Sequence, residues 1–289
     1  MAKPLAVISV PPGGSYIGPR PTVSVVVLTL NEANNIRECI ASCAWCEDVH
    51  VLDSGSTDGT QLLAEQAGAK VWFNRFESFG KQRNWAIDHI PMKHDWVLHL
   101  DADERCTPEL IAEIDAALKA PPSEAGYYIA NQMVLMGSWI RYASGYPAYQ
   151  MRLFHKGRMR FTDVGHGQRE ATSGKIGTLR NPYVHLNFSK GLDDWFARHN
   201  RYSTLEAAEA VKMLGEPLAL GDALKGGLAR RRALKRLAAR MPMRGTFRFL
   251  MTLLVQRGIL DGAAGWRYAK MLAIYEGMIA LKIKERRKR

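Results

Sequence analysis

Short apolar runs that alternate with helical patterns constrain the fold of this chain more than any other feature. Residues 23–30 are nearly all β-branched or leucine, which is typical of a strand buried on both faces of a sheet. Similar runs occupy residues 48–52, 70–73 and 96–100. Helices are expected at residues 33–44, 61–67, 81–89 and 109–118. Strands that alternate with helices form βαβ units, so the sequence predicts an α/β fold with a mostly parallel, Rossmann-like sheet flanked by helices.

The second half of the chain differs from the first. Residues 138–149 are rich in aromatic residues, which favours a loop over a binding site, and residues 163–170 are rich in turn-forming residues. Strands are expected at residues 126–136, 151–154, 175–179 and 183–188, and helices from about residue 192 onward. We therefore predict a loose, proline-containing leader at residues 1–21, an α/β domain at residues 22–190 with halves at 22–120 and 121–190, and a helical extension at residues 191–289.

Basic residues are concentrated at one end of the chain. The formal net charge is +12, and residues 190–289 carry 22 Lys and Arg against 9 Asp and Glu, whereas residues 1–189 carry 18 against 19. Residues 229–240 interleave leucine with arginine, and residues 282–289 hold six basic side chains. This pattern favours helices that lie on an anionic membrane surface. A plain solvated surface is the alternative, and nucleic acid is not expected as a partner because no nucleic-acid motif is recognisable.

The cysteines and the apolar content bear on the cellular compartment. Cys39, Cys43 and Cys46 have helical spacing but lack a fourth zinc ligand at a standard spacing, so we expect these thiols and Cys106 to be buried. Neither a signal peptide nor an apolar run of about 18 residues is present. We therefore expect a cytoplasmic protein, peripheral on the inner face of the plasma membrane.

Acidic and amide side chains follow three of the expected strands. Asn31 and Glu32 follow the first strand, Asp53 ends the second, and Asp101 and Asp103 follow the strand at 96–100. The carboxyl ends of parallel strands meet at one edge of a sheet, where ligands bind. Paired carboxylates there suit a divalent cation that also binds phosphates. Each residue taken alone could instead cap a helix or lie in a solvated loop.

The chain lacks the usual loops that bind phosphate through backbone amides. Neither a Gly-x-x-x-x-Gly-Lys-Ser/Thr pattern nor a Gly-x-Gly-x-x-Gly pattern that opens a helix occurs. A metal ion held by Asp101 and Asp103 would have to bind the phosphates instead.

Four motifs in this order resemble glycosyltransferase family 2, whose members have the GT-A fold. They are Thr29-Leu30-Asn31-Glu32, Val51-Leu52-Asp53-Ser54-Gly55-Ser56-Thr57-Asp58-Gly59-Thr60, Gly80-Lys81-Gln82-Arg83-Asn84 and Leu100-Asp101-Ala102-Asp103-Glu104. The resemblance is strong over residues 22–110 and weaker to about residue 190. A later segment, Gln256-Arg257-Gly258-Ile259-Leu260-Asp261-Gly262, is similar to bacterial enzymes that add a sugar to lipopolysaccharide core or related envelope glycolipids.

The resemblance implies a role for individual positions. The residues expected to bind the nucleotide-sugar are Thr29, Asn31, Glu32, Asp53, Lys81, Arg83, Asp101 and Ala102. The residues expected to bind Mg²⁺ or Mn²⁺ are Asp103, Asp101 and His185. The expected donor is a nucleoside-diphosphate sugar, with a UDP-sugar favoured, and the expected acceptor is a glycolipid or an oligosaccharide. An inverting transfer also needs a carboxylate base, for which Glu170 is our choice and Asp163 the alternative.

Other side chains could contact the acceptor or a phosphate. His166 could bind either one, and Trp139 and Tyr142 could stack on a sugar face, although a small core beneath a loop would explain these aromatic residues equally well. Together these features predict an inverting, metal-dependent glycosyltransferase of envelope glycan synthesis (lipopolysaccharide core or exopolysaccharide). The alternatives are a sugar-nucleotide pyrophosphorylase, which would need a glycine-rich loop after the first strand, and a non-catalytic membrane-associated scaffold.

Overall fold

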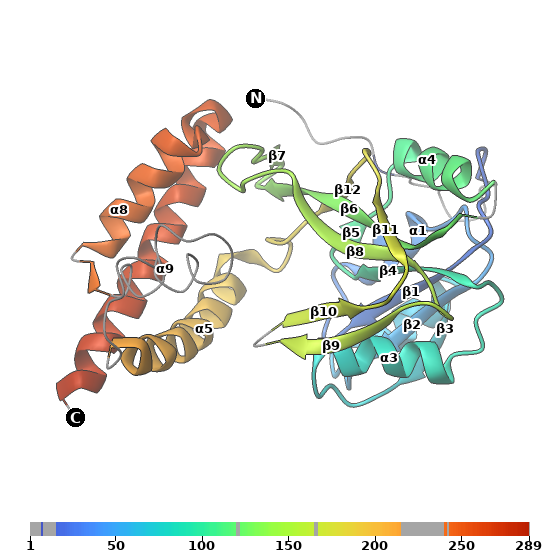
Figure 1. The fold of residues 1–289 in the computed structure, drawn as a ribbon, viewed down its shortest axis with the longest axis horizontal. Coiled ribbons are helices and arrows are strands. Elements are labelled where there is room, and N and C mark those ends of the chain that lie inside the picture. Colours follow the sequence, from blue (N-terminus) through green and yellow to red (C-terminus); the bar gives the residue numbers. More distant parts are fainter. Residues whose placement is uncertain are drawn as a thin grey trace. The chain divides into compact units, whose positions relative to one another are not determined.

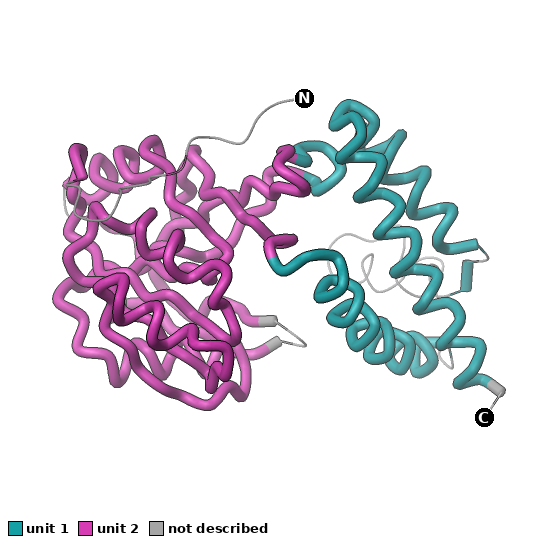
Figure 2. Tube along the Cα trace, turned by 180° about the vertical axis from the view of Figure 1, so that it is seen from behind, with its two compact units in different colours: residues 1–2, 140–145, 190–289 teal, residues 3–139, 146–189 magenta. Residues whose placement is uncertain are grey.

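The chain forms two compact units. The computed structural model describes residue 7 and residues 16–119, 122–164, 167–214, 240–241 and 243–288. The described residues up to Trp139, together with residues 146–189, form one unit, which we call the sheet unit (Figure 2). Residues 140–145 and the described residues from Lys190 onward form the other, the helical unit. The domain limits given above stay a prediction.

Four parallel strands form the first half of the sheet. They are β1 (Val23–Thr29), β2 (Val49–Asp53), β3 (Lys70–Phe73) and β4 (Trp96–Asp101), in the order β3-β2-β1-β4 (Figure 1). Thr29 pairs with Asp53 and Leu28 with Asp101, so the polar ends of three strands reach the same edge. This arrangement confirms the predicted α/β class and the convergence of the strand ends.

Helices connect these strands near the predicted positions. They are α1 (Ile36–Ala41), α2 (Thr60–Gln66), α3 (Phe79–His89) and α4 (Pro108–Leu118). The side chain of Thr107 caps α4 by accepting from the N–H of Leu110 (3.2 Å), and Pro108 occupies the first turn, where no N–H is needed. α1 is shorter than expected because turns precede and follow it.

The second half of the sheet is mixed. β8 (Ala148–His155) runs antiparallel to both β4 and β6 (Glu124–Leu135), and β12 (Tyr183–His185) runs parallel to β6. The short strand β5 (Glu104–Arg105), which begins two residues after Ala102, pairs with β12. β7 (Ser138–Trp139) and β11 (Lys175–Thr178) also pair with β6. Because β5 pairs with β12, the residues that follow β4 lie next to the end of β12.

The described residues of the stretch 163–170, which exclude 165 and 166, lie in strands and not in the turns expected from the sequence. β9 (Arg160–Val164) and β10 (Gly167–Ala171) are antiparallel strands that pack on α3. Asn84 of α3 binds both backbone groups of Phe161, donating to its carbonyl (2.8 Å) and accepting from its N–H (3.0 Å). These tertiary contacts stabilise strands where local residue preferences favour turns, which is why the expectation was wrong.

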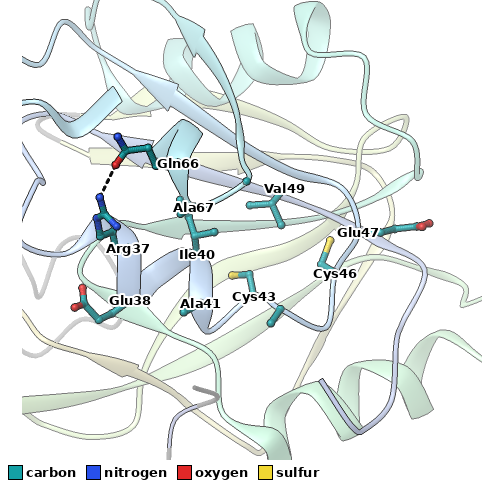
Figure 3. A pocket seen from close by; sticks show the side chains of 12 residues that line it. Arg37, Glu38, Ile40, Ala41, Cys43, Cys46, Glu47, Val49, Gln66 and Ala67 are labelled. Carbon is teal, nitrogen blue, oxygen red and sulfur yellow. Dashed lines mark hydrogen bonds between the residues drawn. The ribbon is translucent and has the colours of Figure 1, made fainter. Parts of the chain in front are cut away.

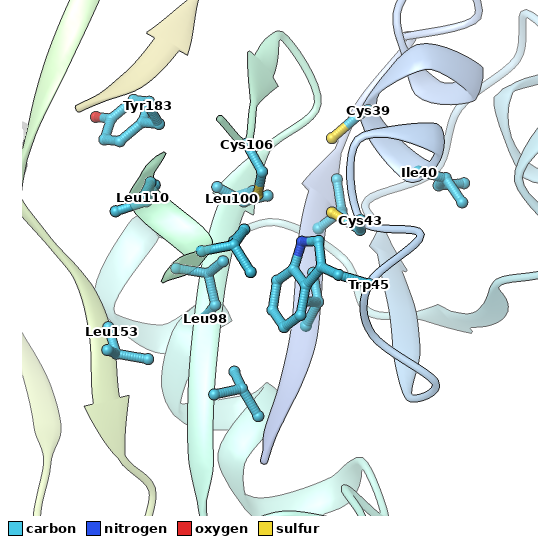
Figure 4. Close-up of a cluster of buried hydrophobic side chains, with 14 of the residues drawn as sticks. Cys39, Ile40, Cys43, Trp45, Leu98, Leu100, Cys106, Leu110, Leu153 and Tyr183 are labelled. Atoms are coloured by element: carbon cyan, nitrogen blue, oxygen red, sulfur yellow. The ribbon is translucent and has the colours of Figure 1, made fainter. Parts of the chain in front are cut away.

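Helices cover the sheet on both faces. α1, α2 and α4 contribute to the core on one face, which includes Trp45, Leu98 and Leu110 (Figure 4). α3 and β9 cover the other face through Ala86 and Phe161. All four cysteines are free thiols. Cys39, Cys43 and Cys106 are buried, as the sequence predicted, whereas Cys46 is only half-buried.

The described part of the helical unit consists of α5 (Gly191–Leu214), α8 (Arg244–Leu250), a π-helical turn η1 (Met251–Val255), a 3₁₀ turn η2 (Gly258–Asp261) and α9 (Gly262–Lys288). α9 packs against both α5 and α8 (Figure 1). Small residues of α5, Ala207 and Ala210, contact Ile279 and Ile283 of α9. None of the helices within the described ranges has both the length and the apolar character needed to cross a bilayer. The basic segment 229–240 lies, except for Arg240, outside the described residues.

Asp261 binds residues 140–145 within the helical unit. Its buried carboxylate accepts hydrogen bonds from the backbone N–H groups of Arg141 (3.1 Å), Tyr142 (2.9 Å) and Ala143 (2.7 Å). Gly258 allows close packing here, because a side-chain Cβ at this position would lie 3.0 Å from the Cβ of Ala143. The segment between Trp139 and Tyr146 is thus fixed by a side chain more than a hundred residues away in the chain.

Candidate functional site

Hydrogen bonds join the loops that follow β1 and β2. Asn31 has the left-handed backbone conformation (φ 55°), which asparagine tolerates better than most residues. Its N–H donates to Ser56 Oγ (2.8 Å) and its Oδ1 accepts from the N–H of Thr57 (2.9 Å). The N–H of Glu32 donates to Thr60 Oγ1 (2.8 Å). The predicted nucleotide-binding residues Asn31 and Glu32 therefore belong to one cross-linked pair of loops.

Asp53 organises the same pair of loops. Its fully buried carboxylate accepts from Thr29 Oγ1 (2.9 Å), the N–H groups of Gly55 (2.9 Å) and Ser56 (2.8 Å), and Gln61 Nε2 (2.6 Å). Burial alone would raise the pKa of Asp53, but the hydrogen bonds from Ser56 and Gln61 prevail and lower it. The structure thus brings Thr29 and Asp53 together. The contact of Asp53 with a base stays a prediction, since these donors already engage both of its oxygens.

Four charged side chains form a cluster at the end of β4. Arg152 Nη2 donates to Asp101 Oδ2 (2.6 Å) and to the carboxylate of Glu104. Glu104 also accepts from the N–H of Asp101 (3.0 Å), and Arg83 Nη2 lies 3.9 Å from Asp101 Oδ1. Arg152, Glu104 and Arg83 are buried, while the side chain of Asp101 is 35 % exposed. Each buried charge has an opposite charge as its neighbour, which is the condition for its burial.

The pKa values of the two carboxyl groups shift in opposite directions. Burial raises the pKa of Glu104 to about 7, although Arg152 opposes the shift. Burial also acts on Asp101, but Arg152 and Arg83 prevail and lower its pKa. Asp101 is therefore the carboxylate that these two arginines hold in its charged form.

Asp103 faces a different partner. His185, at the end of β12, places its Nε2 3.3 Å from Asp103 Oδ2, and the backbone carbonyl of Asp103 accepts from the N–H of Leu186 (2.8 Å). Burial alone would lower the pKa of His185, but Asp103 prevails and raises it. The structure thus brings together two of the three predicted metal ligands. The carboxylate of Asp101, the third, is bound by Arg152.

Arg83 and Lys81 leave α3 in different directions. Arg83 is buried, its Nε donates to Gln168 Oε1 of β10 (2.9 Å), and its Nη1 has no partner among the described residues. Burial lowers the pKa of Arg83 to about 10. Lys81 instead points to Glu77 (2.5 Å), and both side chains are largely exposed. Of the two predicted diphosphate contacts, only Arg83 belongs to the cluster around Asp101.

The two carboxylates predicted as alternative bases also differ. Asp163 of β9 accepts from Ser78 Oγ (2.6 Å) and from the N–H of Gly80 (3.1 Å), and so binds the first turn of α3. Glu170 of β10 is half-buried, and its carboxylate raises the pKa of the neighbouring Tyr128 after the larger effect of burial. His166, between the two strands, lies outside the described residues.

The predicted acceptor aromatics fall in different units. Trp139 packs edge-to-face on Tyr146 in the sheet unit, with ring centroids 5.2 Å apart. Tyr142 belongs to the helical unit, where its N–H binds Asp261 and the guanidinium carbon of Arg141 lies 5.8 Å from the centre of its ring. The contact of Trp139 with Tyr146 agrees with both interpretations given above, a surface that stacks on a sugar and a small core beneath a loop.

A separate hollow of about 630 Å³ lies beside α1 and α2 (Figure 3). Arg37, Gln66, Cys43 and Cys46 line part of it, and none of the described strand-end acids does. Burial raises the pKa of Cys46 to about 12, so its thiol stays protonated and is a poor nucleophile at neutral pH. This hollow therefore does not belong to the candidate site.

Comparison with known proteins bears directly on this site. Residues 24–169, which include Asp53, Asp101 and Asp103 but neither Glu170 nor His185, match the family described as Glycosyl transferase family 2. The chain belongs to this family.

Individual relatives agree with the family. The chain is 27 % identical over 202 residues to a Rhizobium meliloti protein named lipopolysaccharide core biosynthesis glycosyltransferase LpsC, a match that covers 67 % of this chain and 73 % of the relative. An uncharacterized glycosyltransferase of Rickettsia bellii is 35 % identical over 115 residues, covering 39 % of this chain and 38 % of that one. Among solved structures, glucosyl-3-phosphoglycerate synthase from Mycobacterium tuberculosis, in complex with Mn²⁺, UDP and phosphoglyceric acid, is 24 % identical with a TM-score of 0.33, covering 39 % of this chain and 43 % of that chain.

The described side chains of this glycosyltransferase are too few to hold a divalent ion alone, so the substrate would have to supply further ligands. Within the described ranges, no group of three or more His, Cys, Asp and Glu side chains is arranged to hold a metal ion. Asp103 and His185 nevertheless supply a carboxylate oxygen and an imidazole nitrogen from opposed strand ends. Ions such as Mg²⁺ are often bound by one or two carboxylates with phosphate oxygens and water completing the site. The pair fits that mode of binding.

The sequence analysis did not identify Arg152 or the role of Glu104. A signal was present, because Arg152 lies inside the expected strand at residues 151–154, between Met151 and Leu153. A charge on a buried strand requires an opposite charge nearby. The acids of the motif at residues 101–104 were the available partners.

We predict that Arg152→Met destabilises this glycosyltransferase strongly. The substitution preserves much of the apolar stem but leaves Asp101 and Glu104 without their shared cation. The free energy of unfolding should fall by about 3–5 kcal/mol, measured by urea denaturation. Adding Glu104→Gln to this variant should restore part of the loss, since it removes one uncompensated buried charge.

Arg160→Met is the matched control for this substitution. Arg160 pairs with Asp88 at 3.3 Å and donates to the carbonyls of Lys156 (2.7 Å) and Met159 (2.9 Å), but its side chain is about half exposed, so water can replace these contacts. Its loss should change the free energy of unfolding by less than about 1 kcal/mol. Equal effects of the two substitutions would contradict the structural role given to Arg152.

Proposed function

We propose that this family 2 member is an inverting, metal-dependent glycosyltransferase. It moves a sugar from a nucleoside-diphosphate sugar, with a UDP-sugar favoured, to a saccharide or lipid-linked acceptor. The observation that carries this proposal is the placement of Asp53, Asp101 and the Asp103–His185 pair at the carboxyl edge of one sheet, with the buried Arg83 beside them. Ligands of open α/β sheets bind at this edge.

The residues around the donor have complementary tasks in this proposal. The paired loops of Asn31 and Asp53 bind the nucleoside, and Asp103 and His185 hold Mg²⁺ or Mn²⁺. When bound, such an ion neutralises the charge that builds on the leaving nucleoside diphosphate. Arg83, whose Nη1 is free of partners among the described residues, donates to the diphosphate or the sugar.

Inversion requires a base on the side opposite the leaving group. The acceptor oxygen forms a bond to the anomeric carbon while the bond from that carbon to the diphosphate oxygen breaks, and the acceptor proton passes to a carboxylate. The structure supports Glu170 for this task over Asp163, because Asp163 is bound by Ser78 and Gly80 at the start of α3. Glu170 lies two residues along β10 from Gln168, the partner of Arg83.

We further propose that the enzyme acts in envelope glycan synthesis, on lipopolysaccharide core or exopolysaccharide, at the inner face of the plasma membrane. The resemblance to LpsC over 73 % of its length supports the class of acceptor. Exposed Lys284, Arg286 and Arg287 at the end of α9 support contact with anionic lipid.

Asp103→Ala should abolish metal-dependent binding of the nucleotide and sugar transfer without unfolding the protein. In a thermal unfolding assay, UDP with Mn²⁺ should raise the melting temperature of the wild type by roughly 5 °C at a concentration well above the dissociation constant. The variant should show no such shift, because the side chain of Asp103 supplies the carboxylate ligand.

Asp95→Ala is the control, since its carboxylate is 69 % exposed and pairs only with Lys156 in the described structure. It should keep the full shift and full transfer. Full transfer by Asp103→Ala would instead rule out the metal-binding role of this residue. Failure of every nucleotide-sugar tested to shift the wild type would favour a non-catalytic scaffold.

Glu170→Gln should retain the melting-temperature shift with UDP and Mn²⁺ but lose transfer by a factor of about 10²–10⁴, the usual contribution of a general base. Asp163→Asn should mainly lower stability, because it weakens the contact with the first turn of α3. Single-turnover transfer assays on both variants measure the difference. If a stably folded Asp163→Asn variant lost sugar transfer while the Glu170→Gln variant remained active, Asp163 would be the base instead of Glu170.

A further inference from the structure

The helical unit exposes a group of large apolar side chains between residues 243 and 266. We call this group the apolar corner; it consists of Met243, Phe247, Leu250, Leu254, Val255, Ile259, Leu260 and Trp266, each 48–73 % exposed. Neighbouring residues of the same segment, Thr252 and Leu253, are buried instead. The segment therefore has an inner face that packs in the unit and an outer face that is apolar.

The first members of the apolar corner lie on α8 and at its two ends. Phe247 and Leu250 are three residues apart on α8, the spacing of one helix face. Met243 is the left-handed residue that precedes α8, and Leu254 and Val255 lie in the π-helical turn η1, into which α8 continues directly. After this turn, η2 carries Ile259 and Leu260 at its surface.

The charges around the apolar corner are positive. Residues 243–260 contain three arginines and no acidic residue, although one of the three, Arg244, is paired with Glu276 of α9 (2.7 Å). Arg257, Arg267 and Lys270 are exposed. The next acid in the chain, Asp261, is buried and its carboxylate binds three backbone N–H groups, so it does not offset these charges at the surface.

We infer that the apolar corner inserts into the headgroup region of an anionic lipid bilayer, with Arg257, Arg267 and Lys270 contacting lipid phosphates. Basic side chains bordering an apolar face, with a tryptophan at the edge, are typical of helices that lie in a membrane interface. This inference rests on the membrane contact proposed above. It deepens that proposal by adding a second kind of contact. The basic segments 229–240 and 282–289 supply charge, and the apolar corner, from residue 243 to residue 266 in α9, supplies side chains that insert.

The charge distribution favours a bilayer over a second copy of the chain. In a two-fold dimer each patch meets its own equivalent, so the exposed Arg257, Arg267 and Lys270 of one copy would face those of the other. Like charges placed opposite one another disfavour such a contact. Lipid phosphates, in contrast, complement these charges, and acyl chains take up the apolar side chains.

Sedimentation of the full chain with phospholipid vesicles tests this inference. The wild type should bind vesicles of phosphatidylglycerol and phosphatidylcholine, and bind vesicles of phosphatidylcholine alone far more weakly. Leu254→Glu with Ile259→Glu should weaken binding to the anionic vesicles by at least about thirtyfold, because each change removes an inserted side chain and adds a negative charge.

Leu62→Glu with Phe73→Glu is the matched control pair. Leu62 and Phe73 are 58 % and 63 % exposed, similar to Ile259 and Leu254, but lie in α2 and at the end of β3, in the sheet unit. This pair adds the same charge and should leave binding within about threefold of wild type. An equal loss in both pairs would contradict the inference, as would a wild type that does not bind anionic vesicles at low salt.

A second measurement avoids destabilising substitutions. Vesicles that contain brominated lipid should quench the fluorescence of Trp266, detected as the difference between wild type and Trp266→Phe. No difference would contradict insertion. A dimer that dissociates in the Leu254→Glu variant, without a change in vesicle binding, would instead assign the surface to a second copy of the chain.

The rise in melting temperature with UDP and Mn²⁺ needs no lipid. Its absence would therefore count against the proposed glycosyltransferase function and not against the bilayer contact.

Discussion

The carboxyl edge of the parallel strands depends on the contacts of Arg152 with two carboxylates. Its guanidinium contacts Asp101 and Glu104, and the second of these also accepts from the N–H of Asp101. Two acids within four residues at a buried strand end would repel each other and lose hydration. Arg152, supplied by the antiparallel strand β8, makes their burial possible. The acids Asp101 and Glu104, at the end of a parallel strand, are thus stabilised by an arginine from the mixed half of the sheet.

The same contact separates the tasks of the two aspartates. Arg152 and Arg83 engage Asp101, whereas Asp103 faces only His185 among its described side-chain partners. Two neighbouring acids of one motif therefore differ in their availability to a metal ion. On our proposal, Asp103 and His185 bind the ion and Asp101 orients the arginines. On the same proposal, the cross-linked loops at Asn31 and Asp53 bind the nucleoside.

Residue patterns predicted the parallel half of the sheet because buried parallel strands are continuous apolar runs, as residues 23–30 show. The shared metal-binding role of Asp103 and His185 was expected from the family resemblance and not from these patterns, and it stays a prediction. The patterns did not predict the antiparallel pair β9 and β10, whose first strand is bound by Asn84 at Phe161, or the contact of Asp261 with residues 141–143. Such contacts join residues far apart in the chain and have no periodicity. The base remains a prediction because Asp163 and Glu170 differ in their partners and not in their chemistry.

The position of the metal ion tests the central claim most directly. Crystals of the protein grown with UDP and Mn²⁺ would show the ion by its anomalous scattering. We predict a single peak in contact with the Asp103 carboxylate and His185 Nε2, with Arg152 still between Asp101 and Glu104. A peak bound by Asp101 after displacement of Arg152, or an ion that contacts neither Asp103 nor His185 in a crystal that holds UDP, would contradict the account.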